Sequence, residues 1–115
     1  MGESDTFLII SEPSTGVVVI APTADVDMSR SPMLRTAIQQ HMKPSTETLV
    51  VHLEDVGYMD SSGLATLVEA MRTGKATNTN LVLSAMGPKV LAIFEIARLE
   101  SFFTIVAGID EALQP

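Results

Sequence analysis

Cysteine is absent from the 115 residues of this chain, and so is tryptophan. Without cysteine there can be no disulfide, no thiolate nucleophile and no cysteine-based zinc site. A cysteine-free chain suits a reducing compartment, so we expect the protein to be cytoplasmic. No apolar run approaches the ~18 residues that a membrane-spanning helix needs, and direct membrane insertion is therefore not expected.

Basic residues are also scarce. Lysine and arginine together number 7 against 14 aspartates and glutamates, which gives a net charge of −7. An acidic surface is repelled by phosphate backbones, so nucleic acid is not an expected partner. Glycine-rich phosphate loops such as Gly-x-x-x-x-Gly-Lys-Ser/Thr and Gly-x-Gly-x-x-Gly are missing too, and no cofactor is predicted.

The chain does contain the material for a folded core. Hydrophobic residues make up 46% of it, and its length suits one domain. Short aliphatic runs predict strands at residues 7–10, 17–21, 49–53, 81–84 and 102–106. The proline and glycine within residues 12–16 predict a turn, so the first two strands should form a hairpin.

Helices are predicted between the later strands. Apolar residues at helical spacing indicate helices over 32–42, 61–72 and 88–97, with a short terminal turn at 109–113. Ser31 is the predicted N-cap of the first helix and Gly74 the predicted C-cap of the second. Because strands alternate with helices after the hairpin, we predict an α/β fold with a mixed, mostly parallel sheet. One domain is expected over 1–115, with its core at about 7–106.

The most distinctive stretch joins the strand at 49–53 to the second helix. Asp60 or Ser61 is a natural N-cap, and the free amides and dipole of the first turn also favour an added phosphate. Gly63 has no side chain, so another protein's backbone could approach Ser61 and Ser62 closely. Ser62 is expected to satisfy a backbone group of the first turn. Taken alone, a stretch of this kind is more often a simple capped loop than a functional site.

A serine hydrolase would need a base beside its nucleophile. The only histidines are His41, near the end of the first predicted helix, and His52, inside a predicted strand. The serines at 61 and 62 also lack the Gly-x-Ser-x-Gly turn that exposes a hydrolase nucleophile. We therefore predict that the protein is not an enzyme.

Acidic residues suggest a second alternative. Asp25, Asp27, Asp55 and Asp60 are expected near the carboxyl edge of the sheet, where they could hold Mg²⁺ weakly. Such residues more often cap helices and solvate loops, so no metal is predicted. A phosphoaccepting aspartate of the receiver type would require a lysine after the last strand, and none follows Val106.

Three segments resemble the STAS domain of anti-sigma factor antagonists. Residues 59–64, Met-Asp-Ser-Ser-Gly-Leu, match the family's central motif without departure. Residues 24–27 are similar to its Gly-Glu-Leu-Asp segment, from which Ala24 and Asp25 depart. Residues 88–103 resemble its third helix and the strand that follows. The resemblance implies that Ser61 is the phosphorylation site and that Asp27 lies near it.

The resemblance also implies a function, namely partner switching. The unmodified domain would bind an anti-sigma factor that is also its serine kinase, and would so free a sigma factor. Phosphorylation of Ser61 would block that binding, and a serine phosphatase would reverse it. The partner-binding residues implied in this way are Asp25, Asp27, Asp60, Ser61, Ser62 and Gly63. A STAS domain can also serve as an accessory or scaffold subunit of a transport or stress-signalling complex without such a switch.

Overall fold

The computed structural model describes residues 7–114. The elements follow in the order β1 (Leu8–Ser14), β2 (Val17–Pro22), α1 (Ser31–His41), β3 (Thr48–His52), α2 (Ser61–Thr77), β4 (Asn80–Ser84), α3 (Pro88–Ile96), the 3₁₀ turn η2 (Glu100–Phe102), β5 (Thr104–Val106) and α4 (Ile109–Ala112). The predicted hairpin and the alternation of strands with helices are both present.

The five strands form one sheet in the order β1-β2-β3-β4-β5. β1 runs antiparallel to β2, and the remaining neighbours are parallel. This arrangement confirms the predicted α/β class and the mixed, mostly parallel sheet. Within residues 7–114, no helix combines the length and hydrophobicity that a bilayer crossing requires.

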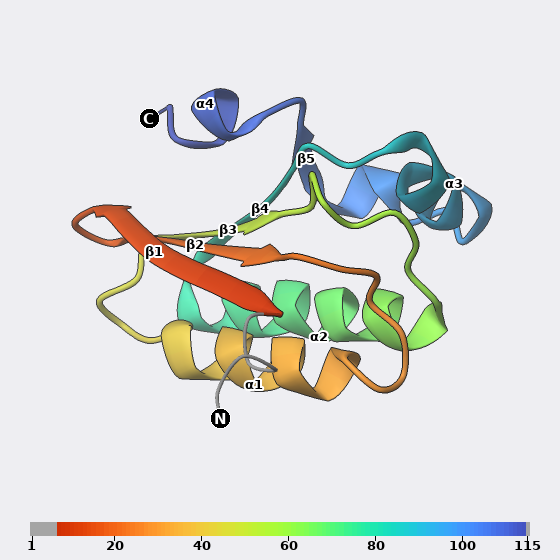
Figure 1. Ribbon diagram of the computed structural model, residues 1–115. Coiled ribbons are helices and arrows are strands. Elements are labelled where there is room, and N and C mark those ends of the chain that lie inside the picture. The colour runs from red at the N-terminus through yellow and green to blue at the C-terminus, as the bar shows by residue number, and fades with distance from the viewer. Residues whose placement is uncertain (1–6, 115) are drawn as a thin grey trace.

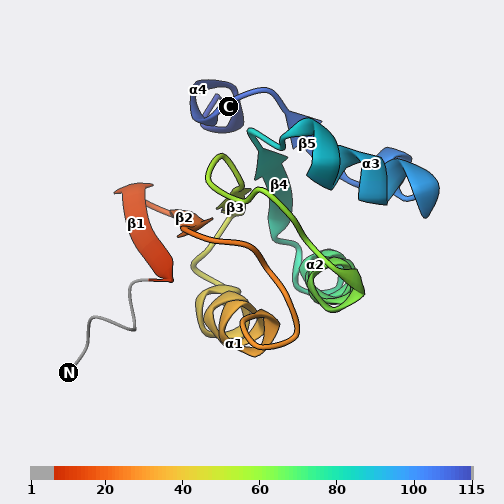
Figure 2. The same cartoon turned by 45° about the vertical axis from the view of Figure 1, so that its right-hand side comes forward.

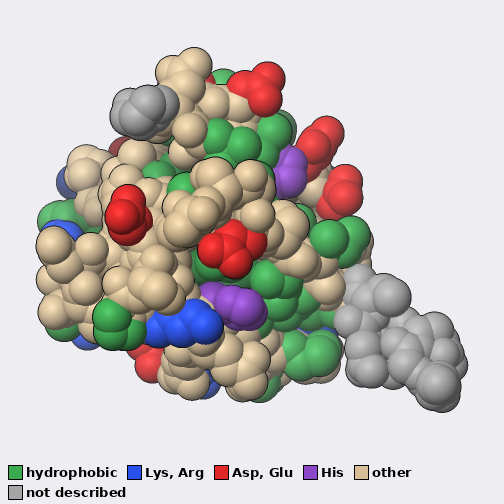
Figure 3. Space-filling view, turned by 90° about the vertical axis from the view of Figure 1, so that its left-hand side faces the viewer, with side chains coloured by type: hydrophobic (Ala, Val, Ile, Leu, Met, Phe, Trp, Pro, Cys, Tyr) green, Lys and Arg blue, Asp and Glu red, His purple; other side chains and the backbone are tan. Residues whose placement is uncertain are grey.

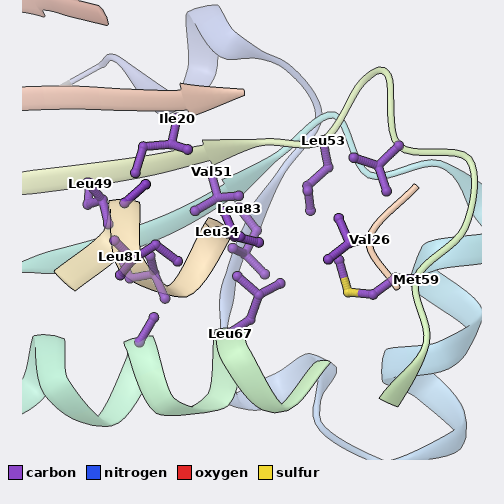
Figure 4. Packing of buried hydrophobic residues seen from close by; sticks show 14 of the residues in the cluster. Ile20, Val26, Leu34, Leu49, Val51, Leu53, Met59, Leu67, Leu81 and Leu83 are labelled. Atoms are coloured by element: carbon purple, nitrogen blue, oxygen red, sulfur yellow. The ribbon is translucent and has the colours of Figure 1, made fainter. Parts of the chain in front are cut away.

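The two faces of the sheet are covered unequally (Figures 1 and 2). α1 and α2 lie side by side against one face, where Leu34, Leu67 and the strand residues Val51 and Leu83 are fully buried together (Figure 4). On the other face, a small cluster of Val19, Val50 and Val82 packs under Ala112 of the short α4. The larger core therefore lies between the sheet and the helix pair.

α2 is longer than predicted. It ends at Thr77, and the C-cap is Asn78, which has the left-handed φ of 64°. Gly74 lies inside the helix. A glycine is needed there because a Cβ would come within 2.8 Å of the Thr79 carbonyl oxygen. The prediction that Gly74 is the C-cap is therefore wrong. The glycine instead lets α2 pass close to the backbone that leads into β4.

Other boundaries also differ from the prediction. Ser31 is the first residue of α1, and the N-cap position falls on Arg30, whose side chain makes no capping bond. β1 continues to Ser14 through a bulge, so the turn is shorter than 12–16. The last strand is confined to Thr104–Val106, because Phe102 belongs to the preceding 3₁₀ turn.

Candidate functional site

Two loops that are far apart in sequence are joined at the carboxyl edge of the sheet. Val26 and Met59 form an isolated parallel bridge. The Val26 N–H donates to the Tyr58 carbonyl at 3.0 Å, and the Asp60 N–H donates to the Val26 carbonyl at 3.1 Å. Both bridged side chains are fully buried (Figure 4). The loop after β2 and the start of α2 are therefore held as one unit.

Asp60, one of the two residues predicted as N-cap, caps α2, and it also binds the other loop. Its Oδ1 accepts from the Ser62 amide at 2.9 Å, the Ser62 hydroxyl at 2.6 Å and the Gly63 amide at 3.3 Å. Its Oδ2 accepts from the Met28 amide at 3.1 Å. The Ser62 hydroxyl is the main cause of a lowered pKa for Asp60; the three amides add to it, and partial desolvation opposes it. Asp60 is therefore a carboxylate at neutral pH.

The two serines that follow differ in what their hydroxyls do. The Ser62 hydroxyl donates to the Asp60 carboxylate, so the expectation that it would satisfy a backbone group is wrong. Ser61 is exposed at the first position of α2. Its hydroxyl has no hydrogen-bond partner within residues 7–114. Ser61 is thus the serine of the pair whose oxygen is open to a reaction partner.

Asp27 organises the loop that leads into α1. Its Oδ1 accepts from the Ser29 hydroxyl at 2.6 Å, the Ser29 amide at 3.0 Å and the Arg30 amide at 3.2 Å. The Ser29 hydroxyl is the main cause of a lowered pKa for Asp27, with the Ser29 and Arg30 amides and the Arg30 charge adding to it and partial desolvation opposing it. Asp27 therefore fixes the turn that precedes α1, while the N-cap position of that helix has no side-chain capping bond.

The remaining acidic residues do not join these two in a cation site. Asp25 is exposed, and its carboxylate lies over Gly57, where a Cβ would be 3.4 Å from its Oδ1. Asp55 is exposed in the loop after β3. Within the described chain, no group of three or more acidic or histidine side chains is placed to hold a metal ion. Asp27 and Asp60 instead direct their oxygens at backbone amides and serine hydroxyls.

Gly63 faces the interior. A Cβ at this position would meet Met59 Cγ at 2.5 Å and Val26 Cγ1 at 2.9 Å. The missing side chain therefore lets α2 pack against the Val26–Met59 bridge. The close neighbours at Gly63 belong to the chain itself, so packing within the chain is sufficient reason for a glycine here.

An apolar groove extends from Ser61 along α2. It has a volume of about 390 Å³ and is lined by Ser61, Leu64, Ala65, Val68, Glu69, Arg72 and Leu99. Beside the bridge, Met28 and Tyr58 are 75% and 51% exposed. Sequence analysis missed this surface, although the apolar Leu64 and Val68 on a helix with only one sheet-facing side were a signal for it.

The histidines lie elsewhere. His52 Nδ1 is 2.8 Å from the Ser84 hydroxyl, and His52 Nε2 is 3.1 Å from Glu54. This serine–histidine–glutamate chain was not foreseen. Ser84 is fully buried, so its oxygen has no access to a substrate. Neither His52 nor His41 is hydrogen-bonded to Ser61 within the described residues.

Comparison with known proteins identifies relatives of this chain. The model of a family described as the STAS domain matches residues 9–112. The anti-sigma-B factor antagonist of Listeria monocytogenes is 27% identical over 96 residues, which are 84% of each chain.

Solved structures give the same fold. An anti-sigma factor antagonist from Mycobacterium paratuberculosis superposes with a TM-score of 0.78 at 27% identity, over 92% of this chain and 89% of that one. SpoIIAA in its unphosphorylated form matches with a TM-score of 0.80 at 22% identity, over 92% of both chains. The phosphorylated form of SpoIIAA from Bacillus matches with a TM-score of 0.74 at 21% identity, over 92% of this chain and 96% of that one.

Proposed function

Because the chain belongs to the STAS domain family, we propose that it is an anti-sigma factor antagonist that acts by partner switching. Its unphosphorylated form binds an anti-sigma factor that is also a serine kinase, and a sigma factor is thereby freed. Phosphorylation of Ser61 blocks binding, and a serine phosphatase restores it. The names of the Listeria and Mycobacterium relatives support the antagonist role.

The observation that carries the proposal is the difference between Ser61 and Ser62. Phosphoryl transfer requires a hydroxyl that can reach the kinase and be oriented as a nucleophile. The Ser62 hydroxyl is held by Asp60 at 2.6 Å, whereas Ser61 is exposed and unpaired within residues 7–114. We therefore assign the acceptor role to Ser61, and to Ser62 and Asp60 the role of holding the start of α2.

The charges around Ser61 support a switch. A phosphoserine carries about −1.5 to −2 charges at pH 7. Asp60 precedes it directly and is ionised, so a phosphate on Ser61 adds like charge to a surface that must lose water on docking. Docking then weakens without a large change of fold.

The docking surface is proposed to combine polar and apolar parts. Ser61 and Asp60 lie at its centre, with the groove of α2 on one side and the exposed Met28 and Tyr58 on another. Asp25 contributes exposed charge at the rim, and Asp27 acts by fixing its own loop. Exposed apolar patches with polar residues beside them mark sites of protein–protein contact. Gly63 takes part only through its backbone.

The test is intact-mass measurement after incubation with ATP and the anti-sigma factor kinases of the source organism. Wild type and the control Ser62→Ala should each gain one phosphoryl group, and Ser61→Ala should gain none. Ser61→Ala should also remain bound to the kinase in the presence of ATP, whereas wild type is released. If Ser61→Ala gained a phosphoryl group and Ser62→Ala did not, the acceptor would be Ser62 and the assignment to Ser61 would be wrong.

Two further outcomes bear on the proposal. Binding to a multi-subunit transport or stress-signalling complex without any mass change would favour the accessory or scaffold role instead. The proposal also holds that the protein is not an enzyme. Hydrolysis of activated esters or phosphomonoesters that disappears in Ser61→Ala would overturn that part.

A further inference from the structure

β1 is an edge strand of the sheet, and within residues 7–114 it pairs with β2 alone (Figure 2). Ile9 pairs with Ala21, and Leu8 stands opposite Pro22, which has no N–H to donate. One residue earlier, the Phe7 carbonyl accepts from the Thr23 amide at 2.7 Å. Hydrogen-bonded and non-bonded pairs alternate along an antiparallel ladder. The N–H and C=O groups of Leu8 and Ile10 therefore point away from β2, toward solvent.

The open part of this edge is short and well defined. Beyond Ser11 the strand bulges before Ser14, and Pro13 cannot donate a hydrogen bond. Bulges and prolines block strand-to-strand pairing. The other edge strand of the described sheet, β5, has three residues. Residues 8–11 are thus the segment on which another strand could pair.

Apolar surface accompanies these free backbone groups. Leu8 and Ile10 line a groove of about 450 Å³ between β1 and α1, together with Phe7, Pro32, Met33, Thr36, Ala37 and Gln40. Ile9 points to the opposite face of the sheet and is 60% exposed, and Ile10 is 40% exposed. On the side of the molecule shown in Figure 3, hydrophobic side chains gather beside the two histidines.

We propose that a second copy of this chain pairs with β1, strand against antiparallel strand. A two-fold axis at Ile9 sets Leu8 of each copy opposite Ile10 of the other, and both residues have their N–H and C=O groups directed outward. The ladder alternation then makes both pairs hydrogen-bonded ones, and Ile9 faces Ile9 of the second copy across a non-bonded position. The two five-stranded sheets become one continuous sheet.

The lack of charge at this edge makes a second copy a possible occupant there. The chain has a net charge of −7, so two copies repel each other over most of their surfaces. Residues 7–11 and every residue that lines the groove are uncharged. A basic partner would gain no ion pair with these residues, and two copies paired over residues 7–11 place no like charges opposite one another. This inference does not depend on the proposed switch at Ser61.

The two-fold register predicts a charge-swap result. Sedimentation of wild type over rising concentration should approach twice the 12.3 kDa of one chain. Ile9→Lys and Ile9→Glu should each remain monomeric, because each places like charges directly opposite one another. An equimolar mixture of the two variants should form dimers again. A monomeric mixture, or wild type that stays monomeric up to about millimolar concentration, would overturn the proposal.

A second pair of variants tests the backbone contact. Ile10→Pro removes an N–H that β2 does not use, so the fold should survive while the dimer is lost. Ile10→Val keeps that N–H and a similar shape, and it should still dimerise. Circular dichroism and thermal unfolding establish that each variant is folded. A dimer that persists in folded Ile10→Pro uses another surface, and the pairing proposed at β1 would be wrong.

Discussion

Asp60 connects two segments because its oxygens accept from different parts of the chain. Oδ1 serves the first turn of α2, and Oδ2 serves the Met28 amide of the loop after β2. The same carboxylate holds the Ser62 hydroxyl. The proposed choice of Ser61 as phosphoacceptor therefore depends on a single side-chain bond, because Asp60 occupies the Ser62 hydroxyl and the Ser61 hydroxyl has no partner within residues 7–114.

The lowered pKa of Asp60 predicts how stability depends on pH. Native Asp60 keeps its charge to a lower pH than an unfolded aspartate, which titrates near 3.8. Below that pH the unfolded chain binds more protons, so this contribution to stability is present above pH 3.8 and is lost as the pH falls through the native pKa. The urea midpoint of Asp60→Asn should therefore fall less between pH 6 and pH 3 than that of wild type.

Asp55 provides the control for this measurement. It is exposed and makes no hydrogen bond within residues 7–114. Asp55→Asn should follow the wild-type curve. Equal losses for Asp60→Asn and wild type would show that Asp60 does not contribute to the acid sensitivity.

Gly63 predicts a steric effect at one position. A Cβ there would lie 2.5 Å from Met59 Cγ, so Gly63→Ala must displace the bridge that positions Asp60. Overpacking of this kind costs about 1–3 kcal/mol. Gly57→Ala is the matched control, because its Cβ would make one contact within 4 Å, with Asp25 Oδ1 at 3.4 Å, and the residue lies outside any helix. Urea unfolding should show a lower free energy of unfolding for Gly63→Ala but not for the control. Similar stabilities of the two variants would contradict the close packing of Gly63 against Met59 and Val26.

At the scale of elements, the residues at its two ends fix where α2 begins and where it stops. Asp60 caps the start, and Asn78 ends the helix in the left-handed region at φ 64°. An L-residue with a Cβ pays about 1–2 kcal/mol in that region, whereas glycine does not. Asn is tolerated because its side chain can bond locally.

Substitution at Asn78 should therefore show a clear order. Asn78→Gly should unfold at or above the wild-type temperature, and Asn78→Ala should lose about 1 kcal/mol of stability. Position 78 is exposed, so neither change disturbs the core. Equal melting temperatures for the two variants would mean that residue 78 does not hold the left-handed conformation in solution.

For the whole molecule, the two faces of the sheet should differ in their contribution to stability. Val50 and Val51 are adjacent in β3 and both fully buried, but they point to opposite faces. Val51 packs in the large core with α1 and α2, and Val50 in the small cluster under α4. A cavity costs less where the surroundings can collapse into it.

We therefore expect Val51→Ala to cost about 2–3 kcal/mol and Val50→Ala about 1–2 kcal/mol in urea unfolding. The two variants are matched in residue type, strand and burial, which isolates the effect of the covering layer. A larger loss at Val50 would show that the α4 face is the more rigid one.

The sequence by itself determined the element order and the α/β class, and it narrowed the N-cap of α2 to Asp60 or Ser61. These depend on periodicities and on contacts over a few residues, which a linear pattern records. The motif at 59–64 also pointed to Ser61 through its family resemblance. A glycine can be a helix C-cap or a site of close packing, and the local sequence does not distinguish the two. The predicted end of α2 at Gly74 was therefore wrong.

Only the tertiary structure decided which serine is free. The Val26–Met59 bridge joins residues 33 positions apart and brings the Met28 amide to Asp60. That arrangement orients the carboxylate toward Ser62 and leaves the Ser61 hydroxyl unpaired within residues 7–114. It also turns Gly63 inward and exposes the groove of α2. Contacts between distant segments depend on how the layers pack, and no local pattern in the chain records that packing.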